Sequence, residues 1–107
     1  MKIKFEKKYL NINPEHFMQR EAAYAHIHSH HTNKDSFVRR MTRDHYPRFH
    51  VYVKSNDEMI EIDLHLDQKQ TSYEGNHAHN AEYEGEQVEQ EVARLKGLLN
   101  EIYKRQK

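Results

Sequence analysis

Side chains that can bind a metal ion are concentrated in the middle of the chain, where several are spaced two residues apart. They are His50, Asp63, His65, Asp67, His77 and His79. Zinc and other first-row divalent ions bind imidazole nitrogen and carboxylate oxygen, usually with three or four protein ligands. Residues two apart on an extended segment point to the same side of it, so such a pair can offer two ligands to one ion. The sequence therefore predicts a divalent metal site, for Zn or another first-row ion, with these six residues as candidate ligands.

Two stretches with a period of two predict a β-hairpin over about residues 48–67, which would carry His50, Asp63, His65 and Asp67. Apolar residues alternate with polar or amphipathic ones in the first stretch, and the alternation is strict in the second. This pattern is typical of strands with one buried and one exposed face. A polar cluster separates the two stretches and predicts the turn. The hairpin therefore gathers its apolar side chains on one face and its histidines and aspartates on the other.

The register of this hairpin decides which ligands meet. With the turn in the middle of the polar cluster, Val53 pairs with Ile60, and the apolar side chains share the core face. The same register places His50 opposite Asp63 and diagonal to His65, at separations of about 5 Å and 7 Å. Two imidazoles and a carboxylate at those separations could converge on one ion. The alternative is a solvated polar face that binds no metal.

The remaining pattern predicts an α+β fold, in which a small antiparallel sheet of three to four strands packs against two helices. The clearest helix is C-terminal, over about residues 86–105, where apolar residues recur at intervals of three and four. Its start is acidic and its end is basic, which complements the helix dipole. A shorter N-terminal helix is expected over about residues 14–25, because Asn13 and Pro14 form a good helix start. The whole chain, residues 1–107, is expected to form a single domain.

Three segments allow more than one structure. Residues 26–33 fit a strand with alternate histidines on one face, a helix with histidines four residues apart, or a loop that binds metal weakly. Residues 35–47 fit a short helix or a strand that returns into the hairpin, and the short connections favour the strand. Residues 69–86 predict a loop that can fold back over the ligand face of the hairpin.

Composition sets limits on the class of protein. The chain contains no cysteine, which excludes disulfides, thiolate metal ligands and cysteine nucleophiles. Acidic and basic residues balance to a net charge of zero, and no apolar run reaches membrane-spanning length. We therefore expect a soluble, cytoplasmic protein without a membrane partner. Ten histidines are spread along the chain, so its net charge should change between about pH 7 and pH 5.5.

Nucleic-acid binding is one alternative to metal binding. The segment 34–54 contains six basic residues against two acidic ones, with Tyr46, Phe49 and Tyr52 interleaved. Basic residues and aromatic rings on a strand can bind phosphates and stack on bases. However, the neighbouring segment 57–67 is acidic, and attraction between two oppositely charged strands accounts for the pattern more simply.

The other alternative is a protein–protein interaction module without metal. The C-terminal helix has a short heptad-like seam that could form a homodimer, although packing against the apolar face of the hairpin is the first expectation. No glycine-rich phosphate loop, nucleophile elbow or His-Glu-x-x-His motif is present. The sequence therefore identifies no catalytic residue and no substrate, and it leaves open whether the protein is an enzyme.

Overall fold

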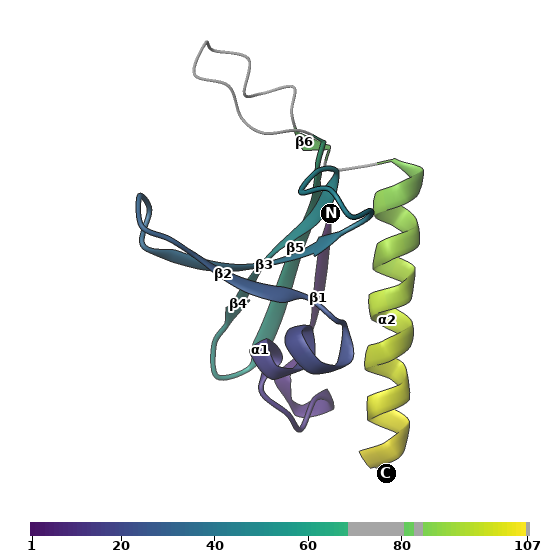
Figure 1. The fold of residues 1–107 in the computed structure, drawn as a ribbon. Helices are drawn as coiled ribbons and strands as arrows, with labels where there is room; N and C mark the ends of the chain where they lie inside the picture. Colours follow the sequence, from purple (N-terminus) through teal and green to yellow (C-terminus); the bar gives the residue numbers. More distant parts are fainter. Residues whose placement is uncertain (69–80, 83–84, 107) are drawn as a thin grey trace.

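The computed structural model describes residues 1–68, 81–82 and 85–106, in which a long helix lies along one face of an antiparallel sheet (Figure 1). The strands are β1 (Lys2–Glu6), β2 (Ala25–Ser29), β3 (Lys34–Arg40), β4 (Arg48–Ser55), β5 (Met59–Asp67) and β6 (Ala81–Glu82). The helical segments are η1 (Lys7–Tyr9), α1 (Pro14–His16), η2 (Phe17–Glu21) and α2 (Glu86–Gln106). The strand order is β1-β5-β4-β3-β2, and β6 pairs with the end of β5. The predicted α+β class is therefore confirmed.

The sheet has five strands along its main path, so the prediction of three to four strands was wrong. The additional strand is β2, which forms from the histidine-rich tract whose structure the sequence left open. Antiparallel pairing with β3 gives this tract its extended form, with Ala25 opposite Val38 and Ser29 opposite Lys34. A strand at a sheet edge depends on the hydrogen bonds its neighbour provides, so its own residue pattern is a weak signal.

β4 and β5 form the predicted hairpin, but their register differs from the predicted one. Val53 pairs with Ile62 rather than with Ile60. The turn is centred one residue later in the chain than expected, and Asn56 Oδ1 accepts hydrogen bonds there from the backbone N–H groups of Glu58 and Met59, at 2.8 Å each. The predicted register was thus wrong by two residues. A shift of two keeps every side chain on its predicted face and changes only the residue that it meets across the strands.

The predicted C-terminal helix is present as α2, and it packs on the apolar face of the sheet (Figure 1). Its buried apolar side chains are Val88, Val92, Leu95 and Ile102. They share one core with the inward side chains of β4 and β5, which are Phe49, Val51, Ile60, Ile62, Leu64 and Leu66. The apolar side of the helix is therefore buried in the core of its own chain. Within the described part of the chain, no helix combines the length and the apolar character that crossing a bilayer requires.

The N-terminal helix begins as predicted but ends earlier. Asn13 Oδ1 accepts a hydrogen bond from the backbone N–H of Glu15 at 2.7 Å, which caps the first turn. Regular α-helix ends at His16 and gives way to a single π-helical turn, η2. Ala23 then adopts a left-handed backbone conformation with φ 65°. This conformation ends the helical segment, so the chain leaves it before residue 25 and enters β2.

A buried polar network joins α2 to the segment that leads into β2. The Tyr24 hydroxyl donates to Glu91 Oε2 at 2.5 Å, and Arg94 Nε donates to Glu91 Oε1 at 2.7 Å. Arg94 also donates to the backbone carbonyl of Ala22 at 2.8 Å. Burial, together with the Glu91 carboxylate, raises the pKa of Tyr24 well above its ordinary value, so the hydroxyl keeps its proton. The network therefore anchors the start of β2 to the helix.

We expect Glu91→Ala to lower the free energy of unfolding by about 2 kcal/mol, because it leaves the buried Tyr24 hydroxyl and the Arg94 charge without their shared acceptor. The partial exposure of Arg94 keeps the loss below that of a fully buried pair. Glu101→Ala, at an exposed position of the same helix, is the control and should change stability by less than about 0.5 kcal/mol. Urea unfolding measures both variants. Equal losses in the two would contradict an anchoring role for Glu91.

Candidate metal centre

Two inner strands carry the candidate site on the face of the sheet opposite α2. His50 projects from β4, and His65 and Asp67 project from β5. Their neighbours Val51 and Leu64 point into the core, so alternation along each strand turns the three polar side chains the other way. In the observed register His50 lies directly opposite His65. The two imidazoles are therefore cross-strand neighbours, with the carboxylate two residues further along β5.

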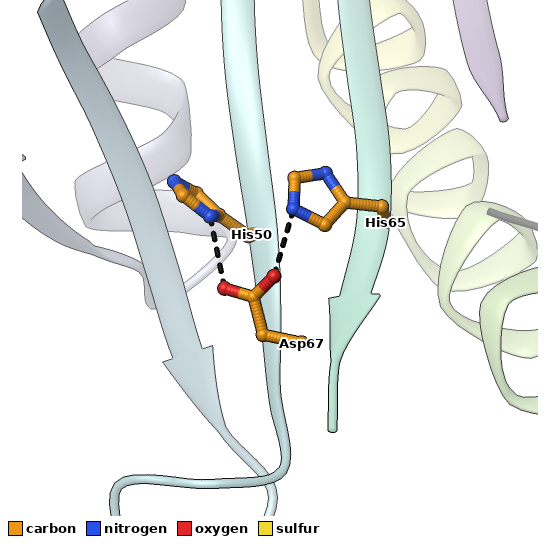
Figure 2. A group of neighbouring side chains, drawn as sticks. All are labelled: His50, His65 and Asp67. Carbon is orange, nitrogen blue, oxygen red and sulfur yellow. Dashed lines mark hydrogen bonds and ion pairs between the residues drawn. The ribbon is translucent and has the colours of Figure 1, made fainter. Parts of the chain in front are cut away.

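The Asp67 carboxylate lies between the two imidazoles (Figure 2). Its Oδ2 atom is 3.0 Å from His50 Nδ1, and its Oδ1 atom is 2.9 Å from His65 Nε2. One ligand atom from each of the three residues lies within 4.8 Å of the other two. The side chains are only 11%, 11% and 17% exposed for His50, His65 and Asp67. The structure thus contains a compact, mostly buried His/His/Asp group that could hold a metal ion.

Three further side chains surround this group. Ser36 Oγ, from β3, is 2.8 Å from His50 Nε2, the ring nitrogen that faces away from Asp67. Arg48 Nε donates to Asp67 Oδ2 at 3.2 Å. The Tyr52 ring lies 4.8 Å from the His50 ring, between centroids. Hydrogen bonds and ring contacts therefore fix His50 from several sides.

Asp67 carries a full negative charge at neutral pH. Burial by itself would raise the pKa of its carboxyl, but hydrogen bonds from His50 and His65 outweigh burial and hold the pKa well below its ordinary value. An ionised carboxylate next to two imidazole nitrogens is a donor set typical of zinc and other first-row divalent ions. Three protein ligands would leave a coordination position for water or a small ligand.

The same atoms also show the connectivity of a Ser-His-Asp relay, with Ser36 Oγ next to one nitrogen of His50 and Asp67 next to the other. A nucleophilic serine needs access to its substrate. Ser36 is only 4% exposed and lies within β3, opposite Ile27 of β2. Burial therefore favours a positioning role for this hydroxyl, in which it orients the His50 ring.

The structure brings together three of the six ligands that the sequence proposed. Asp63 lies opposite Tyr52 and Lys2, and it is outside the His/His/Asp group because the register differs by two residues from the predicted one. His77 and His79 lie outside the described residues. Ser36 and Arg48 were not among the predicted site residues. The correct register would have revealed Arg48, because it is the direct cross-strand partner of Asp67.

Two of the six basic residues in the segment proposed for nucleic-acid binding form ion pairs within the chain. Arg39 lies 3.7 Å from Glu91, and Arg48 is bound to Asp67. Phe49 is buried in the core and has no face to offer a base. These contacts give the segment a structural role in the sheet.

Comparison of the chain with models of protein families, with curated proteins and with solved structures gave no match.

The depressed pKa of Asp67 leads to a prediction on stability against pH. The ionised Asp67 carboxylate should contribute stability that is fully present above about pH 4, the pKa of this carboxyl in the unfolded chain. This stability is lost as the pH falls toward the lower pKa that the carboxyl has in the folded protein. The difference in unfolding free energy between the wild type and Asp67→Asn, measured with chelator present, should therefore shrink as the pH falls from 5 to 3. A difference that stays constant over this range would contradict the assignment.

Proposed function

We propose that the protein binds one divalent first-row metal ion through His50, His65 and Asp67. The observation that carries this proposal is the convergence of two imidazole nitrogens and one carboxylate oxygen within 4.8 Å of one another. Zinc is the reference ion for such a donor set, and other first-row ions with affinity for imidazole are alternatives.

Burial supports metal binding over a solvated polar face. His16 and His45 lie at the surface of this chain. His50 and His65, by contrast, are withdrawn from solvent on inner strands, together with a carboxylate. Burying three polar side chains, one of them ionised, costs free energy unless they are hydrogen-bonded and the charge is paired. A bound cation would add a strong attraction to the same three groups.

Ser36 supports the proposal because its hydroxyl can act as donor or acceptor. When His50 is neutral and donates from Nδ1 to Asp67, Ser36 donates to Nε2. When Nδ1 binds a metal, the ring proton moves to Nε2, which then donates a hydrogen bond to Ser36 Oγ. Metal-bound histidines commonly donate their second ring N–H in this way, which fixes the ring and strengthens the ligand. The same contact therefore supports His50 with and without metal.

Calorimetric titration of chelator-treated protein with Zn²⁺ should show a tight binding event of one ion per chain. The single variants to test are His50→Asn, His65→Asn and Asp67→Asn. Each removes a ligand, so each should lower the affinity by more than the roughly 10–100-fold that loss of a supporting contact costs. Metal at about 100 times its dissociation constant should stabilise the wild-type fold by about 2.7 kcal/mol. Thermal unfolding gives this second measurement.

The matched control is Asp63→Asn, which removes a carboxylate on the same face of β5 and outside the group. It should leave the affinity unchanged. The double variant His77→Asn/His79→Asn tests whether the following segment supplies a further ligand. The proposal would be withdrawn if the wild type showed no saturable binding, or if Asp63→Asn and Asp67→Asn weakened binding equally.

We expect Ser36→Ala to weaken metal binding by about 10–100-fold, because His50 loses the partner of its second ring nitrogen. Ser55→Ala, at an exposed position of β4, is the control and should have no effect on the affinity. The thermal stability of the metal-free variant separates positioning from a general loss of structure. A drop in metal-free stability with unchanged affinity would contradict the positioning role.

A further inference from the structure

A second group of histidines and an aspartate lies on the hairpin of β2 and β3. Pairing of β3 with β4 covers only Phe37–Arg40, whereas pairing with β2 extends to Lys34 and Ser29 at the far end. The end of this hairpin therefore separates from β4, as the arm on the left of Figure 1. We call it the arm. Its histidines belong to residues 26–33, whose structure the sequence left open. None of them belongs to the group formed by His50, His65 and Asp67.

One carboxylate oxygen joins two imidazoles on the arm. Asp35 Oδ1 is 2.9 Å from His26 Nε2 and 2.9 Å from His28 Nδ1. His28 is the cross-strand partner of Asp35, and His26 lies two residues before it on the same face of β2. The His30 ring is 5.3 Å from that of His28, between centroids. The arm thus repeats the His/His/Asp combination, with another imidazole next to it.

The arm group is separate from the first site. Asp35 and Ser36 are consecutive residues of β3, so their side chains point to opposite faces of the strand. Ser36 reaches His50, whereas Asp35 reaches His26 and His28. The two groups therefore lie on opposite faces and share no residue, and one can be changed without removing a ligand of the other.

We propose that His26, His28 and Asp35 form a second divalent-ion site. Imidazole-rich sites favour late first-row ions, with Cu²⁺ bound more tightly than Ni²⁺ or Zn²⁺. The Asp35 carboxylate places an oxygen ligand next to a ring nitrogen of each histidine. The His26, His28 and Asp35 side chains are 40%, 36% and 55% exposed. A hydrated ion can therefore reach them without unfolding of the sheet.

The arm site binds more weakly than the site of His50, His65 and Asp67, which we call the sheet site. Among the residues that the structure describes, only the sheet group has its ligand atoms drawn together within 4.8 Å. The arm side chains must rotate to meet around one ion, and ordering exposed side chains costs free energy that a preorganised site does not lose. We expect the arm to bind Zn²⁺ at least ~10-fold more weakly than the sheet site does.

Calorimetric titration of the full chain with Ni²⁺ and Zn²⁺ tests this proposal. The wild type should show a tight binding event and a weaker one. Introducing His26→Asn/His28→Asn, with the sheet ligands kept, should remove one equivalent of the weaker binding and leave the tight event unchanged. His16→Asn/His45→Asn removes two exposed histidines elsewhere and should retain both events. Imidazole NMR signals of the two arm histidines should shift as the weaker site fills with Zn²⁺. Unchanged stoichiometry in the arm variant, or arm signals that do not respond to Zn²⁺, would overturn the proposal.

A variant without the sheet ligands distinguishes the two sites. The variant His50→Asn/His65→Asn should lose the tight event and still bind one metal ion weakly. Adding His26→Asn/His28→Asn to this variant should remove the remaining binding. Loss of all binding in the sheet variant, with its fold intact by circular dichroism, would overturn the arm site and leave the proposed function standing. Loss of all binding in the arm variant alone would instead leave the arm site standing and contradict the proposed function.

Discussion

Burial of one face of the β4–β5 hairpin under α2 is the constraint on which the rest of the structure depends. Side chains alternate along both strands, so the face that packs Val51 and Leu64 into the core must turn His50 and His65 outward. Slippage by one residue would place the imidazoles in the core and the apolar side chains in water. The strength of the apolar contact therefore protects the position of the polar group, although no polar side chain takes part in it.

The sequence predicted the elements whose pattern is long and regular. The hairpin and α2 are confirmed because each has a clear period, of two and of about 3.6 residues. The ligand set was predicted less well, because the hydrogen bonds of Asn56 shift the register by two residues. Asp63, predicted opposite His50, faces Tyr52 instead, and His65 occupies the opposite position. The face to which each side chain of a strand points follows from the strand's own residue pattern. The residue that it meets on the neighbouring strand depends on the turn.

Elements with few contacts of their own were the hardest to predict. The tract that forms β2 has no apolar alternation strong enough to separate strand from helix or loop, and its structure depends on pairing with β3. The contact of Ser36 with His50 crosses from β3 to β4, so it could be found only after the order of the strands was known. The local residue pattern therefore predicts helices and strands, whereas the site is formed by contacts between segments that are distant in the sequence.

The two histidine–aspartate groups differ in how far the fold organises them. The sheet group is held by inner strands, withdrawn from water and supported by Ser36, whereas the arm group is exposed at the end of a projecting hairpin. Preorganisation by inner strands leads us to place the main metal site on the sheet. Anomalous diffraction at the zinc edge, from crystals of the zinc-loaded protein, tests this most directly. We expect a peak in contact with His50 Nδ1, His65 Nε2 and Asp67, whereas a map that shows zinc elsewhere and the carboxylate still bonded to both rings would contradict it.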